Sequence, residues 1–168
     1  MVLLLCMGEK KVGIKLALII NERTKKKRRD RMYKIMVVTH GNMAATLKET
    51  LKMFTNDVDN VYTVGLGKEG VEDFKERLDK EVKICYEKDK GLLILADIFG
   101  GTPFNVCMLE VKNKYDGVEI ITGVNLPMLI EATLSKDSNL IDVIKNLQQV
   151  SKDSIIQPEN LISSDDED

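Results

Sequence analysis

The stretch GLLILADIFGGTP, residues 91–103, decides the fold of this 168-residue chain. Residues 91–96 form an uninterrupted apolar run, which is typical of a central strand covered on both faces. Asp97 ends the run, and the double glycine that follows opens a helix. Thr102 suits the N-cap of that helix and Pro103 suits its first position. The stretch therefore predicts a buried strand that leads directly into a helix.

Strands and helices alternate on both sides of this stretch. Further apolar runs predict strands at 33–38, 61–64 and 118–122. Apolar residues at helical spacing predict helices at 44–54, 71–85, 100–114, from 125 onward and at 140–150. This alternation specifies an α/β fold with a mainly parallel sheet. We expect a flavodoxin-like sheet of order 2-1-3-4, covered by helices on both faces. Residues 154–158 are a candidate further strand, which Pro158 confines to an edge or a strand end.

The composition is that of one ordinary domain joined to a segment of different character. Hydrophobic residues make up 43% and charged residues 31%, which excludes collagen, low-complexity disorder and a disulfide-stapled miniprotein. The net charge of −2 offers no general attraction for nucleic acid. Three widely spaced cysteines indicate reduced thiols in a cytoplasmic protein. No apolar run approaches the roughly 18–20 residues that span a bilayer.

Residues 1–31 form an N-terminal extension that holds ten Lys or Arg and only three Asp or Glu. Residues 32–168 hold fifteen Lys or Arg and twenty-four Asp or Glu. Its charges interrupt the apolar stretches too early for a secretory signal. The basic run at 25–29 suits contact with anionic lipid or nucleic acid, and a tail without a role is the alternative. A third hypothesis is that Arg28 and Arg29 are encoded by a purine-rich ribosome-binding site. In that case the native start is Met32, and residues 1–31 are a misassigned upstream start.

Two reactive side chains follow the first and third predicted strands. His40 follows the first and Asp97 follows the third, and sites in such sheets lie at the carboxyl ends of the strands. In the order 2-1-3-4 these strands are neighbours, so we expect the two side chains to meet. A carboxylate that accepts a hydrogen bond from Nδ1 would leave Nε2 exposed and would stabilise the imidazolium. A structural histidine and a capping aspartate are the alternative on position alone.

The helix start beside this pair is suited to an anion. Near Thr102 it presents backbone N–H groups and a positive dipole end, and Gly100 and Gly101 let an anion approach the backbone. We group Gly41, after the histidine, with these candidate phosphate-binding residues. Together the parts suit a histidine that takes up a phosphoryl group and passes it on. Such a transfer needs positioning and charge stabilisation, so we expect no metal and no cofactor.

A second glycine-rich motif, GLGKEG at 65–70, matches the dinucleotide-binding pattern GxGxxG. That pattern requires an acidic residue roughly 20 residues further on, at the end of the next strand. Here the next predicted strand ends at Asp97, thirty-two residues after Gly65. The motif also follows the second strand instead of the first. Dinucleotide binding is therefore disfavoured.

Three motifs carry a family resemblance: IMVVTHG at 35–41, ADIFGGTPFN at 96–105 and TGVNLPM at 122–128. Together they resemble the IIA component of the mannose family of the bacterial phosphoenolpyruvate-dependent sugar phosphotransferase system. The resemblance runs from about Tyr33 to Val150. It implies that His40 is the phosphorylated histidine, that Asp97 orients it and that Thr102 stands at the phosphate-binding helix start.

The resemblance also implies partners and an assembly. The IIA component accepts a phosphoryl group from HPr and passes it to a IIB component, which serves sugar import by the membrane components IIC and IID. The family forms homodimers that exchange a strand, and Ser154 to Ile162 is its counterpart here. We therefore expect a IIA domain at 32–162, an acidic tail at 163–168 and IIB as a separate protein.

Three other functions stay open. A sister branch uses a IIA-like domain to phosphorylate dihydroxyacetone, and it ranks second because the GGTPFN block is not characteristic of it. A regulatory phosphohistidine module is a further alternative. A flavodoxin-like binding protein that is never phosphorylated is the most remote.

Overall fold

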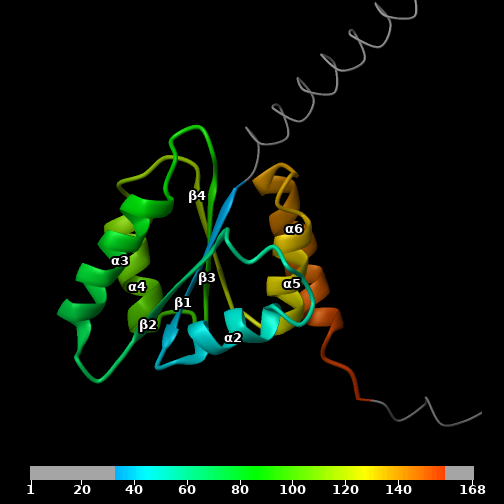
Figure 1. Ribbon diagram of the computed structural model, residues 1–168, viewed down its shortest axis with the longest axis horizontal. Coiled ribbons are helices and arrows are strands. Elements are labelled where there is room, and N and C mark those ends of the chain that lie inside the picture. Colours follow the sequence, from blue (N-terminus) through cyan, green and yellow to red (C-terminus); the bar gives the residue numbers. More distant parts are fainter. Residues whose placement is uncertain (1–32, 158–168) are drawn as a thin grey trace, which may run out of the picture.

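Four parallel strands in the order β2-β1-β3-β4 form the centre of the computed structural model, which describes residues 33–157 (Figure 1). The strands are β1 (Lys34–His40), β2 (Val61–Leu66), β3 (Leu92–Ala96) and β4 (Val118–Thr122). The helices are α2 (Met43–Leu51), α3 (Val71–Cys85), α4 (Thr102–Cys107), the π-helical η1 (Met108–Lys112), α5 (Leu126–Leu134) and α6 (Leu140–Asp153). The predicted α/β fold and its strand order are confirmed.

Helices cover both faces of the sheet (Figure 1). Because side chains alternate along a strand, Ile35 and Val37 of β1 pack in a core with α2, α5 and α6. Met36 and Val38 pack in a second core with α3, α4 and η1. All five residues of β3 are buried, as the apolar run at 91–96 predicts for a central strand.

The first helix is shorter than its apolar spacing predicts. It ends at Leu51, which is buried, and Phe54 is 57% exposed instead of lying on the apolar face. After Leu51 the chain continues in turns, and in one of them the Phe54 N–H donates a hydrogen bond to the Leu51 carbonyl at 2.9 Å. The helix therefore ends at a buried residue, and apolar spacing alone does not give that end.

The second strand is longer than predicted, because it continues through Gly65 and Leu66. A Cβ atom on Gly65 would stand 2.0 Å from the carbonyl oxygen of Gly41. Only a glycine lets the two backbones approach so closely. The first glycine of the GxGxxG motif therefore serves strand pairing here, instead of opening a loop.

The helix after β3 differs from the prediction at both ends. Gly101, with extended backbone, is the N-cap, so Thr102 is the first helical residue and each predicted cap position is wrong by one. The predicted single helix to residue 114 is also wrong, because α4 gives way to a π-helical turn at Met108. After this wider turn the Lys112 ammonium lies beside β4, where it bonds the Val118 carbonyl and Glu119.

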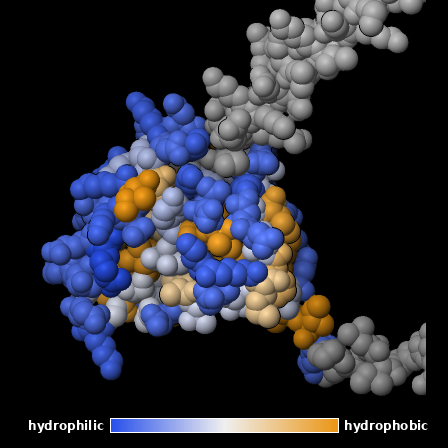
Figure 2. Space-filling model, viewed as in Figure 1, coloured by the Kyte–Doolittle hydropathy of each residue, from blue (hydrophilic) through white to orange (hydrophobic). Residues whose placement is uncertain are grey.

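Beyond α6 the described chain makes no strand. Residues 155–157 belong to no strand of the sheet, and Ile155 and Ile156 are 83% and 70% exposed. Figure 2 shows apolar surface where the described chain ends. The N-terminal extension 1–31, the rest of the candidate exchanged strand (158–162) and the acidic tail 163–168 lie outside the described residues. Between residues 33 and 157, no helix has the length and apolar character needed to cross a membrane.

The central strand should account for much of the stability. Leu95 is fully buried in β3, so we expect Leu95→Ala to lower the free energy of unfolding by about 3 kcal/mol, from lost burial and the cavity left behind. Leu134→Ala removes the same atoms from a side chain that is 67% exposed, and should change the value little. Urea unfolding of both variants measures the difference. Equal losses in the two variants would contradict this assignment of the core.

Candidate functional site

The pairing of β1 with β3 brings His40 and Asp97 together. Val38 lies opposite Ala96 in this parallel pair, so the two strands reach the carboxyl end of the sheet side by side. Oδ2 of Asp97 accepts a hydrogen bond from the backbone N–H of His40 at 2.8 Å and lies 2.9 Å from its Nδ1. Oδ1 accepts the N–H of Ile98 at 2.8 Å. The contact expected from the strand order is therefore present.

The aspartate sets the tautomer of the histidine. An ionised carboxylate only accepts hydrogen bonds, so Nδ1 must carry the hydrogen in this contact. In the neutral imidazole the lone pair then lies on Nε2. The His40 side chain is 44% exposed, whereas that of Asp97 is 9% exposed. The pair consists of an accessible ring and a largely covered carboxylate behind it.

Hydrogen bonding keeps Asp97 ionised. Partial burial raises the pKa of its carboxyl, but hydrogen bonds from the backbone and ring of His40 and from the Ile98 N–H together outweigh burial and lower the pKa. A carboxylate that stays charged next to Nδ1 stabilises positive charge on the ring. The site can therefore support a histidine that becomes an imidazolium during a reaction.

Gly101 lies directly against the histidine ring. A Cβ atom at this position would stand 2.9 Å from Cε1 of His40. Gly100 adopts a left-handed backbone with φ of 75°, and the Asn105 side-chain amide donates a hydrogen bond to its carbonyl at 2.8 Å. The sequence analysis did not predict this role of Asn105. The available signal was its position four residues after the double glycine.

The candidate phosphate-binding residues are not equivalent. Gly41 donates its N–H to the Leu66 carbonyl at 2.8 Å, and Gly101 donates its N–H to Ile98 at 3.2 Å. Neither N–H is free for an anion. Within residues 33–157, the N–H groups of Gly100 and Thr102 make no hydrogen bond, so these two remain as donors at the start of α4.

Two apolar side chains near the site were also missed. Ile98 and Phe99 follow Asp97 and are 58% and 78% exposed, and the Phe99 ring lies 5.1 Å from that of Phe104. The signal was present in the sequence, because apolar residues in a turn between strand and helix have little core to enter. They form an apolar surface beside the exposed histidine.

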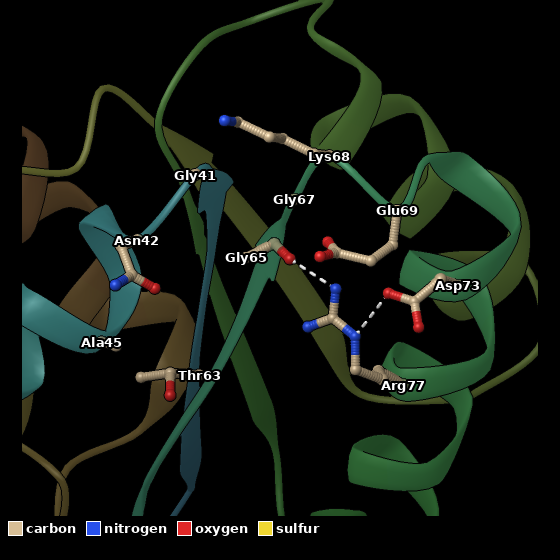
Figure 3. A pocket seen from close by; sticks show the side chains of 10 residues that line it. All are labelled: Gly41, Asn42, Ala45, Thr63, Gly65, Gly67, Lys68, Glu69, Asp73 and Arg77. Carbon is tan, nitrogen blue, oxygen red and sulfur yellow. Dashed lines mark hydrogen bonds and ion pairs between the residues drawn. The ribbon is translucent and has the colours of Figure 1, made fainter.

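A pocket of about 570 Å³ lies next to Gly41, at the outer side of β2 (Figure 3). The GxGxxG segment forms part of its lining. Arg77 crosses it, with Nη2 donating to the Gly65 carbonyl and Nε donating to Asp73, both at 2.8 Å. In the described range 33–157, no three His, Cys, Asp or Glu side chains are grouped as metal ligands would be.

Comparisons with known proteins agree on one family. The model of the family described as PTS system fructose IIA component matches residues 34–148. The PTS system fructose-specific EIIA component of Bacillus subtilis (strain 168) is 31% identical over 125 residues, which are 73% of this chain and 84% of that protein. The mannose-specific EIIAB component of Escherichia coli (strain K12) is 33% identical over 106 residues, 62% of this chain but only 32% of that protein.

Solved structures give the same likeness. The mannose/sorbose specific IIA subunit of the phosphotransferase system from Enterococcus faecalis aligns with a TM-score of 0.67 at 27% sequence identity. The alignment covers 75% of this chain and 94% of that one. The observed sheet and its helices are therefore shared with a IIA subunit over almost its whole length.

The acidity of Asp97 can be measured directly. Because its pKa is lower in the folded than in the unfolded chain, the ionised carboxylate stabilises the fold at neutral pH. That contribution is lost as the pH falls through the folded-state pKa. We expect carbon NMR of the Asp97 carboxyl to give a midpoint below the usual aspartate value, and Asp97→Asn to make stability less sensitive to acid. A midpoint at or above the usual value would contradict the hydrogen-bond network.

Proposed function

This chain belongs to the mannose family of IIA components of the sugar phosphotransferase system, and from that membership we propose a cytoplasmic phosphocarrier that is phosphorylated on His40. His40 accepts the phosphoryl group from phospho-HPr and passes it to a IIB component, and the membrane components IIC and IID then use it for sugar import. The observation that carries this proposal is the contact of His40 with Oδ2 of Asp97. It leaves Nε2 as the accessible nucleophile.

In the uptake step, Nε2 attacks phosphorus while the bond from phosphorus to the donor breaks. The electron pair of that bond leaves with the donor, and the ring gains positive charge as the Nε2–P bond forms. Asp97 balances this charge through the hydrogen on Nδ1. In the second step the acceptor attacks phosphorus, the Nε2–P bond breaks and its electron pair returns to the ring. His40 is then neutral again and ready for the next donor.

The phosphoryl oxygens are held at the start of α4. The unbonded N–H groups of Gly100 and Thr102 supply donors, and the helix end adds a positive partial charge. Gly101 contributes by lacking a side chain, which leaves room beside the ring. Gly41 contributes only a left-handed turn with φ of 56°, because its N–H is used in the sheet.

We further propose a homodimer in which residues 154–162 of one protomer add to β4 of its partner. β4 is an edge strand, and a groove of about 650 Å³ runs beside it. Apolar side chains line much of that groove, among them Phe104, Met128 and Ile155. The exposure of Ile155 and Ile156 supports a segment that is buried only in an assembly. Phe99 lines the same groove, so the assembly would extend to the neighbourhood of His40.

Phosphorylation by the general enzymes tests the function. Incubation with phosphoenolpyruvate, enzyme I and HPr should give one acid-labile phosphoryl adduct by intact mass. His40 is the only histidine of the chain, so His40→Ala should give none. Asp97→Asn should stay folded but take up phosphoryl groups at least tenfold more slowly, about 1.4 kcal/mol or more, because an amide stabilises imidazolium less well. A folded wild-type protein that stays unmodified beside a working control IIA would refute the proposal.

The assembly has its own test. Sedimentation velocity should show a dimer for the wild type and a monomer for Ile155→Asp, because a buried charge in the exchanged segment is costly. Ile141→Asp places the same charge on another isoleucine, 66% exposed near the start of α6, and should leave the dimer intact. A dimer that both variants keep would rule out residues 154–162 as the exchanged segment.

A further inference from the structure

The four loops at the carboxyl end of the sheet contain very little positive charge. They lie between β1 and α2, β2 and α3, β3 and α4, and β4 and α5. Of these described loops, only the second holds a Lys or Arg, and that residue is Lys68 of the GxGxxG segment. The nearest loop to it, after β1, follows His40 directly. This one cation is therefore placed where it can affect the approach of a charged group to the histidine.

Lys68 lies beside the end of β1. His40 is opposite Leu66 in the parallel pair, and Gly41 donates its N–H to the Leu66 carbonyl at 2.8 Å. Lys68 follows two residues later, on a loop that begins next to Gly41. Both line the pocket of about 570 Å³, and in Figure 3 the lysine side chain extends toward the side where Gly41 lies.

The Lys68 ammonium is available. Its side chain is exposed and takes part in no ion pair or hydrogen bond within residues 33–157. The other cation of the pocket, Arg77, is already held by the Gly65 carbonyl and by Asp73. Glu69 turns its carboxylate back over Gly67, where a Cβ atom would meet its Oε2 at 2.1 Å. Lys68 is thus the cation of this pocket that can turn to an incoming group.

A phosphoryl donor meets unfavourable charge at this site. The Asp97 carboxylate stands directly behind the His40 ring, and residues 33–157 hold fifteen Lys or Arg against nineteen Asp or Glu. An arriving phosphoryl group is itself an anion. A cation at the rim would raise its local concentration and reduce the repulsion during approach.

We propose that Lys68 is a positioning residue that draws the anionic phosphoryl group to His40. The inference rests on the proposed phosphocarrier function and adds the residue through which the donor's charge is recognised. Lys68 acts on approach and orientation, and the Nε2–P bond is formed by His40 alone. Its loss should therefore affect kcat/KM for phosphoryl uptake more than kcat.

The test compares phosphoryl uptake by wild type, Lys68→Gln and Lys68→Arg, with phospho-HPr and with phosphoramidate as donors. We expect Lys68→Gln to lower kcat/KM about fivefold at low salt with either donor, and Lys68→Arg to restore most of the loss. The difference should fade toward 1 M salt, where the screening length is about 3 Å. Lys88→Gln removes the same charge from an exposed lysine between α3 and β3, at the other end of the strands, and should behave as wild type.

Three other outcomes would contradict the role proposed for Lys68, each in a different way. Uptake by Lys68→Gln equal to that of wild type with both donors would overturn the proposal and leave the phosphocarrier function standing. A loss seen with phospho-HPr alone would also overturn it, because the lysine would then contact the carrier's surface instead of the phosphoryl group. A wild-type protein that gains no adduct from either donor would end both the function and this inference.

Discussion

The site depends on one carboxylate oxygen, Oδ2 of Asp97, which meets both the backbone N–H and the Nδ1 of His40. The first contact ties the end of β1 to the end of β3. The second sets the direction of the ring. Because one atom makes both contacts, the imidazole is held in a fixed orientation relative to the backbones of two adjacent strands, β1 and β3. Most residues of these two strands are buried, so a packed core holds an exposed histidine ring.

Two glycines bring the remaining parts of the site to this pair. Gly65 lets β2 approach the turn after His40, and Gly101 lets the start of α4 approach the ring. In both cases the neighbour lies where a Cβ atom would stand, so the close approach depends on the missing side chain. The fold therefore places a strand end and a helix start on opposite sides of the same histidine.

The strands and the contact of His40 with Asp97 could be predicted, because a run buried on both faces and a parallel order leave few arrangements. The helix end at Leu51 could not, since the apolar spacing continues to Phe54, which is exposed and lies outside the helix. The shift of the cap from Thr102 to Gly101 depends on backbone angles that either residue type allows. The π-helical turn at Met108 could not be predicted either, because the analysis of apolar spacing assumes the regular α-helical repeat.

The hydrogen bond from Arg77 to the Gly65 carbonyl has a consequence for the sheet as a whole. That carbonyl points away from β1, on the side where another strand would join β2. With this acceptor occupied, the outer edge of β2 offers one carbonyl fewer to an added strand, and the Lys112 ammonium does the same at the outer edge of β4, where it bonds the Val118 carbonyl. A strand that joined either edge would first have to displace a side-chain cation from a backbone carbonyl. Both edges of the sheet are therefore guarded against indiscriminate pairing, which would otherwise let copies of the chain stack into a filament.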